Sequence, residues 1–349
     1  MTFPLIDADS HYIPIDVFKY VSEENKAKLP VIGFDSNNKL SVNIKDRDPN
    51  PITGNPLPPD FHNDYQGFYD IESRIKDFEK MGISFQMLNP QEHAMRFGYS
   101  VDKDLAIEMS YSYNRVLLET IKKYPDKFNG PVLLPLQDID WCLSEIDWAA
   151  ENNFTSVIID TAWAYDTRFP DLILEFPRFE EILKKCHDRD LVINFHHQMH
   201  QISFSKNKTI SQYRLGGVFP STQQLLLISL VTSGVFSRYP NLKVLISEGG
   251  MPFILKSFKY LKNINEKTID FFRKNLWFTI ETEQTVALKE CIELFGSERF
   301  VFATDYPHND TGGQAKFIDH KLINNIGLDE EQINNICYKN AKELFKLTI

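Results

Sequence analysis

The chain is predicted to fold as an α/β protein of the (β/α)8, or TIM-barrel, type: a closed barrel of eight parallel strands ringed by helices. Two observations predict this fold. From about residue 70 onwards, short apolar runs alternate with amphipathic helical segments. Four of the apolar runs end abruptly in Asp, Glu or His. Parallel strands deliver functional side chains to the carboxyl end of a barrel in this way.

The length and composition fit one globular domain with a large core. The chain has 349 residues, of which 42% are hydrophobic and 25% are charged. Two average domains would also fit this length, but barrels commonly reach it as one domain. We therefore expect a single domain over residues 1–349, with an excursion at about residues 30–66 over the barrel mouth. The excursion is rich in proline, Asn and Asp, as surface loops are.

Charge, cysteine usage and hydropathy limit the partners. A formal net charge of -10 argues against a nucleic-acid footprint. The N-terminus has no basic region followed by an apolar run, and no stretch approaches membrane-spanning length. We therefore expect a cytoplasmic protein with neither nucleic acid nor membrane as a partner. Free thiols, with no thiolate metal site, are expected for the four widely spaced cysteines, Cys142, Cys186, Cys291 and Cys337.

The pattern predicts eight strands, each followed by a helix. Gly82 is expected to end one helix, and Asp138 to cap another. The predicted strands are residues 3–9, 83–88, 130–136, 156–160, 191–196, 242–248, 276–280 and 300–305. The predicted helices are residues 70–81, 103–123, 138–151, 177–188, 221–237, one beginning near Pro252, 284–295, one from about residue 314, and 329–345.

Residues of metal-ligand types follow four of these strands. Asp9 and His11 end the first strand, and His196 ends the fifth. Glu248 and Asp305 end the sixth and the eighth. Because the carboxyl ends of barrel strands meet around one mouth, we expect these side chains to converge. Asp9 and His11 are two residues apart, so in extended chain they point to the same side.

This group of side chains is suited to metal-assisted chemistry. Imidazole and carboxylate ligands suit divalent zinc, manganese or iron, and clustered carboxylates repel each other without a cation. We predict one divalent metal ion, zinc in preference to manganese or iron, held by Asp9, His11, His196 and Asp305. A bound metal makes hydroxide available near neutral pH, and a nearby carboxylate can take the proton. Asp305, Glu248 and His196 are the predicted catalytic residues.

Each of these residues also has a structural alternative. Asp305 and Glu248 could cap the helices that follow them. His11 and His196 could be hydrogen-bonded structural histidines, and Asp9 could orient a ligand instead of binding the metal. The presence of companion motifs at four strand ends favours the functional interpretation.

Further candidates fall in the predicted mouth loops, where they could contact a small-molecule substrate. Arg96 carries the planar guanidinium that suits a substrate carboxylate. Simple surface placement is the alternative for every member of this set. The candidate substrate-binding residues are His197, His200, His93, Arg96, Trp163 and His308.

Five motifs together resemble a known family. With them the sequence resembles the amidohydrolase superfamily, and within it the branch of aminocarboxymuconate semialdehyde decarboxylase and the resorcylate decarboxylases. The resemblance runs nearly end to end and implies a TIM barrel, a bound metal and commonly a homodimer. The motifs are Ile6-Asp-Ala-Asp-Ser-His11, Phe195-His196, Ser247-Glu-Gly-Gly250, Ala303-Thr-Asp-Tyr-Pro-His308 and Asn340-Ala-Lys-Glu-Leu-Phe345.

The chain departs from the family pattern at two positions. Asp9 stands where His or Glu is usual, and Glu248 stands where His is frequent. The fourth strand ends in Ile159-Asp160-Thr161, without a lysine, so a two-metal centre bridged by a carboxylated lysine is not expected.

The reaction type is predicted from Glu248. Because its carboxylate accepts protons at neutral pH, it favours hydroxide formation. We therefore predict a metal-dependent hydrolase of a small cyclic, amide-type or lactone-type substrate. The alternatives are a non-oxidative decarboxylase of an aromatic or unsaturated carboxylic acid, and a degenerate barrel that only binds.

Overall fold

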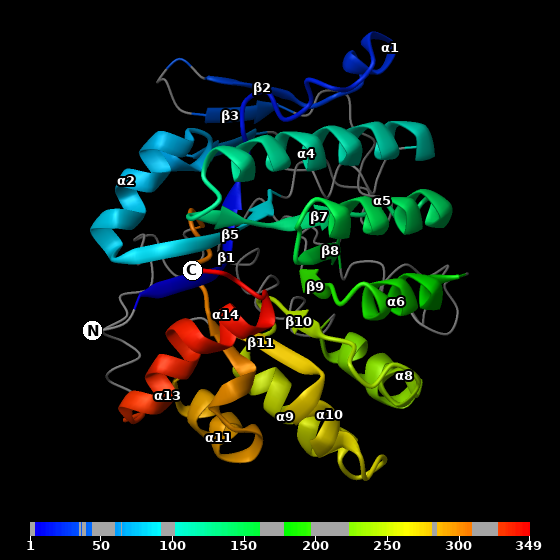
Figure 1. The fold of residues 1–349 in the computed structure, drawn as a ribbon, viewed down its shortest axis with the longest axis vertical. Coiled ribbons are helices and arrows are strands. Elements are labelled where there is room, and N and C mark those ends of the chain that lie inside the picture. The colour runs from blue at the N-terminus through cyan, green and yellow to red at the C-terminus, as the bar shows by residue number, and fades with distance from the viewer. Residues whose placement is uncertain are drawn as a thin grey trace, which may run out of the picture.

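Parallel strands form a closed barrel, and helices pack around its outside (Figure 1). The computed structural model describes residues 4–34, 36, 40–43, 60–63, 65–91, 102–160, 178–196, 223–280, 285–308 and 327–349. The barrel strands are β1 (Leu5–Tyr12), β5 (Ile83–Pro90), β6 (Phe128–Asn129), β7 (Pro131–Leu133), β8 (Ser156–Asp160), β9 (Val192–His196), β10 (Val244–Ile246), β11 (Leu276–Ile280) and β12 (Phe300–Phe302).

Two ladders make up the barrel, one in the order β1-β5-β6 and one running from β7 to β12. β6 and β7 are successive pieces of one barrel strand, separated by Gly130. A Cβ atom on Gly130 would lie 2.6 Å from the carbonyl oxygen of Leu88 on β5, so only glycine lets the two strands pass this closely. The predicted eight-stranded barrel is thus confirmed.

The barrel closes where its first strand meets its last. Ser10 and Tyr306 form a parallel bridge between the end of β1 and the chain just beyond β12. The His11 amide donates to the Tyr306 carbonyl at 2.6 Å, and the Asp305 amide donates to the Asp9 carbonyl at 2.9 Å. These two hydrogen bonds form the seam that completes the ring of strands.

Most helices begin and end where the sequence predicts. Asp70 caps α2 by accepting from the Ser73 amide at 2.8 Å, and Gly82 ends it at φ 73°. Asp138 caps α5 in the same way. The helices are α1 (Glu23–Lys26), α2 (Ile71–Met81), α4 (Lys103–Lys123), α5 (Ile139–Glu151), α6 (Phe179–Asp188), residues 223–232, α8 (Val235–Arg238), α9 (Met251–Leu261), α10 (Thr268–Lys274), α11 (Thr285–Phe295), α13 (Glu330–Asn334) and α14 (Asn340–Leu344), with short 3-10 turns η1 (Gln66–Phe68) and η3 (Ser297–Arg299) and a π-helical turn η4 (Asn335–Lys339).

Two helical predictions need correction. The predicted helix over 221–237 is interrupted at Gly234, whose φ of 75° is incompatible with a continuing right-handed helix. The predicted helix over 329–345 contains the π-helical turn η4 between α13 and α14. α10 was not predicted. The helix predicted from about residue 314 lies outside the described residues.

The core has two layers. The larger cluster lies between the strands and the surrounding helices. A smaller cluster fills the barrel interior, and it includes Ile6 and Ala8 from β1 together with Leu344 and Phe345 from the C-terminal segment. The C-terminal helix α14 therefore packs against the barrel interior, in front of the strands in Figure 1.

The predicted excursion contains an antiparallel sheet of β2 (Val31–Phe34), β3 (Leu40–Asn43) and β4 (Asp60–Asn63). β2 and β3 lie at the upper edge of the molecule in Figure 1. Because residues 44–59 are outside the described part, a position over the barrel mouth stays a prediction.

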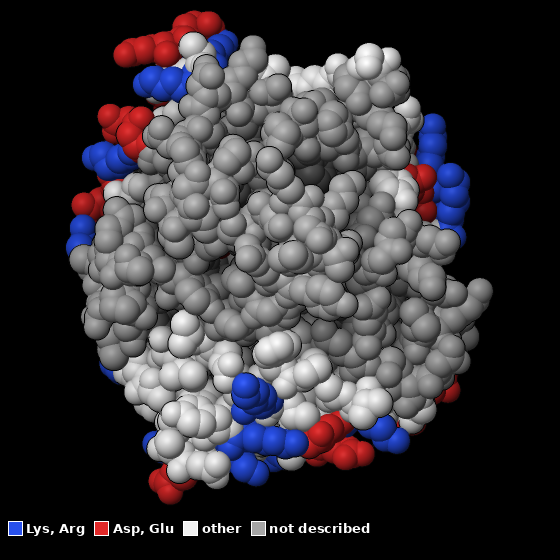
Figure 2. All heavy atoms as spheres, turned by 180° about the vertical axis from the view of Figure 1, so that it is seen from behind, with Lys and Arg blue, Asp and Glu red and all other residues white. Residues whose placement is uncertain are grey.

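The described surface carries both signs of charge. On the face shown in Figure 2, Lys and Arg side chains alternate with Asp and Glu around the rim of the view. Among the described residues, none of the helices combines the length and the apolar character needed to cross a bilayer.

Candidate metal centre

A bulge in β1 aims two of the predicted ligands into the barrel. Ile6 and Ala8 belong to the interior cluster. In a regular strand the even-numbered residues after them would also face inward, and Asp9 and His11 would face outward. The pairing of β1 with β5 shifts in register between Asp7 and Ser10. The extra residue reverses the alternation, so that Asp9 and His11 also face inward.

The inner part of the site consists of Asp9, His11 and His196. Their side chains are 1%, 0% and 2% exposed, and one ligand atom from each lies within 4.8 Å of the others. Asp9 Oδ2 is 3.6 Å from His196 Nε2, and Asp9 Oδ1 is 3.8 Å from His11 Nε2. Asn89, at the end of β5, donates a hydrogen bond to Asp9 Oδ1 and so holds this carboxylate in place.

The orientation of His11 follows from its hydrogen bond to the backbone. Its Nδ1 lies 2.9 Å from the Pro90 carbonyl oxygen, which can only accept, so Nδ1 carries the proton. In the neutral ring, Nε2 then presents a lone pair, 3.3 Å from Asp305 Oδ1. A lone pair facing a carboxylate oxygen is unfavourable unless a proton or a cation lies between them.

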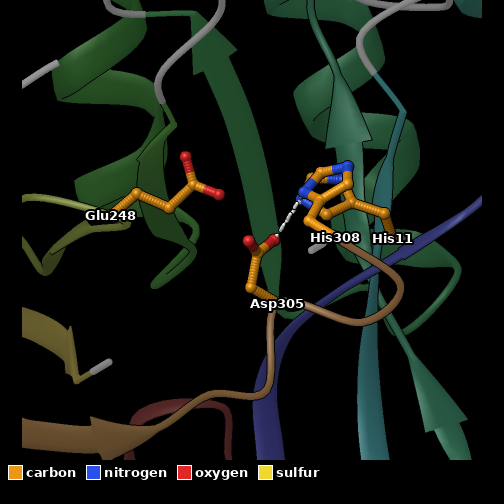
Figure 3. A group of neighbouring side chains, drawn as sticks. All are labelled: His11, Glu248, Asp305 and His308. Atoms are coloured by element: carbon orange, nitrogen blue, oxygen red, sulfur yellow. Dashed lines mark hydrogen bonds and ion pairs between the residues drawn. The ribbon is translucent and has the colours of Figure 1, made fainter. Parts of the chain in front are cut away.

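The outer part of the site consists of Glu248, Asp305 and His308, whose side chains are 14%, 20% and 13% exposed. His308 Nδ1 lies 2.7 Å from Asp305 Oδ1, and His308 Nε2 lies 3.1 Å from Gln91 Oε1. Figure 3 shows the Glu248 carboxylate on one side of Asp305 and the His11 and His308 rings on the other. The exposed fractions place these groups closer to the barrel mouth than the inner three.

The two carboxylate residues near the mouth, Glu248 and Asp305, both have an unusual backbone conformation. Glu248 has φ 56° and Asp305 has φ 52°, in the left-handed region that non-glycine residues rarely occupy. The Glu248 amide is held by the Thr279 hydroxyl at 3.0 Å, and the Asp305 amide by the seam with β1. Strained conformations of this kind persist where the surroundings fix them, and they gather at functional sites.

The electrostatics favour a bound cation. Burial opposes ionisation of Asp305, but the charge and the hydrogen bond of His308, together with the neighbouring His11, outweigh it and hold the Asp305 pKa below its usual range. Burial also opposes ionisation of Asp9, and His196 more than offsets this, so the Asp9 pKa is lowered too. Burial and the neighbouring His308 lower the pKa of His11, which favours its neutral form. Ionised carboxylates beside a neutral imidazole form a donor set for a metal ion.

A further buried carboxylate, Asp7, lies beneath the site. Burial raises its pKa to about 7, although hydrogen bonds from Thr304 oppose the shift. The Thr304 amide and hydroxyl donate to it at 2.9 Å and 2.6 Å. Asp7 thereby ties β1 to the chain after β12.

The structure brings together all five predicted strand-end residues. His308, predicted from the mouth loops, joins them through Asp305. The roles assigned to these residues stay predictions. The other five candidates, His93, Arg96, Trp163, His197 and His200, lie outside the described residues.

Sequence reasoning missed Asn89 and Gln91. Asn89 lies at the end of β5 and Gln91 just beyond it, with the same two-residue spacing that Asp9 and His11 show at the end of β1, so the same argument would have found them.

The residues present fit a single divalent cation. Asp9 Oδ2 and His11 Nε2 are buried and have no hydrogen-bond partner among the described residues. Unsatisfied buried polar atoms are rare, and two that face the same carboxylate-rich space point to a missing ligand. Nitrogen and oxygen donors without thiolate suit zinc, manganese or iron.

Comparisons with known proteins identify decarboxylases among the relatives of this chain. The chain is 23% identical over 299 residues to gamma-resorcylate decarboxylase of Polaromonas sp., covering 80% of this chain and 88% of that protein. It is 24% identical over 293 residues to 2-amino-3-carboxymuconate-6-semialdehyde decarboxylase of Dictyostelium discoideum, covering 80% and 77%.

A solved structure shares the fold. The dihydroxybenzoic acid decarboxylase of Polaromonas sp., with bound manganese and the inhibitor 2-nitroresorcinol, aligns with a TM-score of 0.66 and 19% identity over 99% of this chain and 98% of that one.

These relatives overturn the prediction of hydrolysis, which is wrong. They are decarboxylases, as the alternative prediction had it. The prediction rested on Glu248, a proton acceptor at neutral pH that stands where the family frequently has a histidine. The structure places His196 Nε2 3.7 Å from Glu248 Oε1, and His308 belongs to the same group of ligand atoms, so groups able to donate protons are at hand.

The match to a family model covers almost the whole chain. The amidohydrolase family model matches residues 6–347, which include every described strand end of the site. The relatives and the barrel agree with this assignment. The chain therefore belongs to the amidohydrolase family.

Proposed function

We propose that the protein is a metal-dependent, non-oxidative decarboxylase of an aromatic or unsaturated carboxylic acid. One structural observation supports the proposal in addition to the likeness to the relatives. A cation-binding donor set and an imidazole–carboxylate pair, Asp305 with His308, meet at the carboxyl ends of the strands. Decarboxylation without an oxidant requires both a positive charge near the substrate and a proton source.

Asp9, His11, His196 and Asp305 would hold one divalent ion. When bound, the ion supplies a Lewis-acidic positive charge that orients and polarises substrate oxygens. Zinc remains our proposed metal, with manganese or iron as alternatives, and the manganese in the Polaromonas decarboxylase supports a divalent ion of this group. Elemental analysis of the purified protein should find about one such ion per chain.

The chain's own residues would deliver the proton. In this reaction the carbon that bears the carboxylate gains a proton, and the electron pair of the broken carbon–carbon bond returns to the ring or alkene as carbon dioxide leaves. His308 has an acceptor at each ring nitrogen, Asp305 Oδ1 at 2.7 Å and Gln91 Oε1 at 3.1 Å. Both nitrogens can therefore carry a proton, and the Asp305–His308 pair can pass one toward the mouth.

Glu248 would complete the wall opposite this pair (Figure 3). Its carboxylate lies 3.7 Å from His196 Nε2, so it would lie beside the metal-bound imidazole while facing the substrate.

The test is a panel of hydroxybenzoic and unsaturated acids, incubated with the metal-loaded protein in deuterium oxide. We expect carbon dioxide release, with one deuterium entering the product at the carbon that lost it. Oxygen-18 from labelled water entering the organic product, without carbon dioxide release, would show hydrolysis instead.

The proposed partner is thus a small-molecule carboxylic acid. The Polaromonas structure binds 2-nitroresorcinol, a ligand of the same size class. A homodimer and a cytoplasmic location stay predictions, and size-exclusion chromatography with light scattering tests the first.

A further inference from the structure

Arg74 is a buried arginine directly behind the site. It lies on α2, outside the barrel, and its side chain is 0% exposed, the largest fully buried side chain in the part of the chain that the structure describes. Burying a guanidinium is costly unless its donors are satisfied. Burial lowers its pKa to about 10, so it remains charged at neutral pH.

The guanidinium donates to four acceptors. Nη1 donates to the His11 carbonyl at 2.7 Å and to the Gly67 carbonyl at 3.1 Å. Nη2 donates to the Ser10 hydroxyl at 2.7 Å, and Nε donates to Gln86 Oε1 at 2.7 Å. Two of the acceptors belong to the end of β1, next to the predicted ligands, and one to the neighbouring strand β5.

Aromatic rings surround the same guanidinium. Its central carbon lies 5.0 Å from the ring centroids of Phe78 and Tyr306 and 5.7 Å from that of Tyr12. Tyr306 follows Asp305 directly, and its carbonyl accepts the His11 amide at 2.6 Å. Arg74 thus contacts both sides of the seam, through the His11 carbonyl and through the Tyr306 ring.

From these contacts we propose that Arg74 is a positioning residue, which fixes the relative placement of the His11 and Asp305 side chains by clamping β1 to the chain after β12. The role rests on the proposed metal centre. A planar fork with several donors can bind carbonyl, hydroxyl and amide oxygens at once, and a lysine ammonium cannot reproduce that geometry.

The test compares Arg74→Lys with a matched control, Arg115→Lys. Arg115 is also largely buried, donates to Glu145 Oε2 at 3.0 Å and stacks 3.3 Å from the Trp148 ring centroid, but it joins α4 to α5 away from the site. Residues that orient ligands typically change metal affinity by about 10–100-fold when replaced. We expect Arg74→Lys to weaken zinc or manganese binding by about tenfold or more, measured by competition with a chromogenic chelator.

Two further readouts separate positioning from plain stability. The visible spectrum of the cobalt-substituted protein should change in Arg74→Lys and stay unchanged in Arg115→Lys. In the metal-free protein, hydrogen–deuterium exchange should speed up in peptides covering residues 8–13 and 303–308 only for Arg74→Lys. Ser10→Ala removes one Arg74 acceptor and serves as the test if Arg74→Lys does not fold.

The results distinguish the two levels of the argument. If the unaltered protein binds metal and both Arg74→Lys and Ser10→Ala match its affinity and cobalt spectrum, the positioning role is refuted and the centre stands. If the unaltered protein binds no divalent metal, the centre itself is refuted, and the positioning role with it.

Discussion

Replacing Asp9 with Asn should abolish most of the metal-dependent stabilisation of the protein. Asp9 is 1% exposed, its Oδ2 is unsatisfied among the described residues, and it lies between the two inner imidazoles. Asparagine has nearly the same shape and can keep an oxygen toward the Asn89 amide, so the packing is preserved. The change removes one negative charge and one ligand atom from the site.

The magnitude follows from binding linkage. A metal present at 1,000 times its dissociation constant stabilises the folded protein by about 4 kcal/mol. Loss of residues that only orient ligands weakens affinity by about 10–100-fold, so loss of a charged ligand should cost at least about 100-fold. At the same metal concentration the stabilisation then falls to about 1.4 kcal/mol, a loss of about 2.7 kcal/mol, or about 4 °C in melting temperature for a chain of this size.

The assay is a thermal melt of the metal-free and metal-loaded forms of each protein. The control is Asp16→Asn, since Asp16 is 60% exposed and its carboxylate pairs with Lys19 at 3.3 Å, away from the site. Asp16→Asn should retain the full metal-dependent shift. An Asp9→Asn protein with the full shift and one metal per chain would refute the assignment of Asp9 as a ligand.

Three further predictions concern the site, the barrel and the thiols. His196→Ala and Asp305→Asn should each lose metal while keeping their far-ultraviolet circular dichroism, because strand-end residues in this fold serve chemistry more than stability. Full metal content in both variants would show that the metal binds elsewhere. Gly130→Ala should lower the free energy of unfolding by about 1–3 kcal/mol in urea titrations, since its Cβ would lie 2.6 Å from the Leu88 oxygen; unchanged stability would contradict that contact. All four cysteines, Cys142, Cys186, Cys291 and Cys337, are buried, and burial raises the pKa of each thiol. The native protein should therefore not react with a disulfide reagent, and the same reagent should titrate four thiols after denaturation.

The sequence predicted those features that depend on local pattern. The helix over 103–123 and the strand over 156–160 have the predicted bounds, because apolar periodicity and flanking polar residues define them locally. Convergence of the strand ends was also predictable, since the barrel topology brings them together whatever the loops do.

Features that depend on contacts between distant segments were not predictable. The bulge in β1 appears only in its pairing with β5, and the left-handed backbone of Glu248 and Asp305 is imposed by neighbouring strands. Arg74 lies four residues before Phe78, so helical spacing places it on the apolar face of α2. Its burial depends on acceptors that other segments supply.

The seam of the barrel also bears on how the protein is made. Asp7 and Thr304, which hydrogen-bond across it, are 297 residues apart in the chain. Contacts of such long sequence separation form late, because the loop that they close is entropically costly. The proposed ligands Asp9 and Asp305 lie on opposite sides of that seam, so a nascent chain on the ribosome holds only part of the donor set until its last barrel strand emerges. Metal loading would therefore come at the end of synthesis, and a partly made chain would have no complete centre with which to capture an ion.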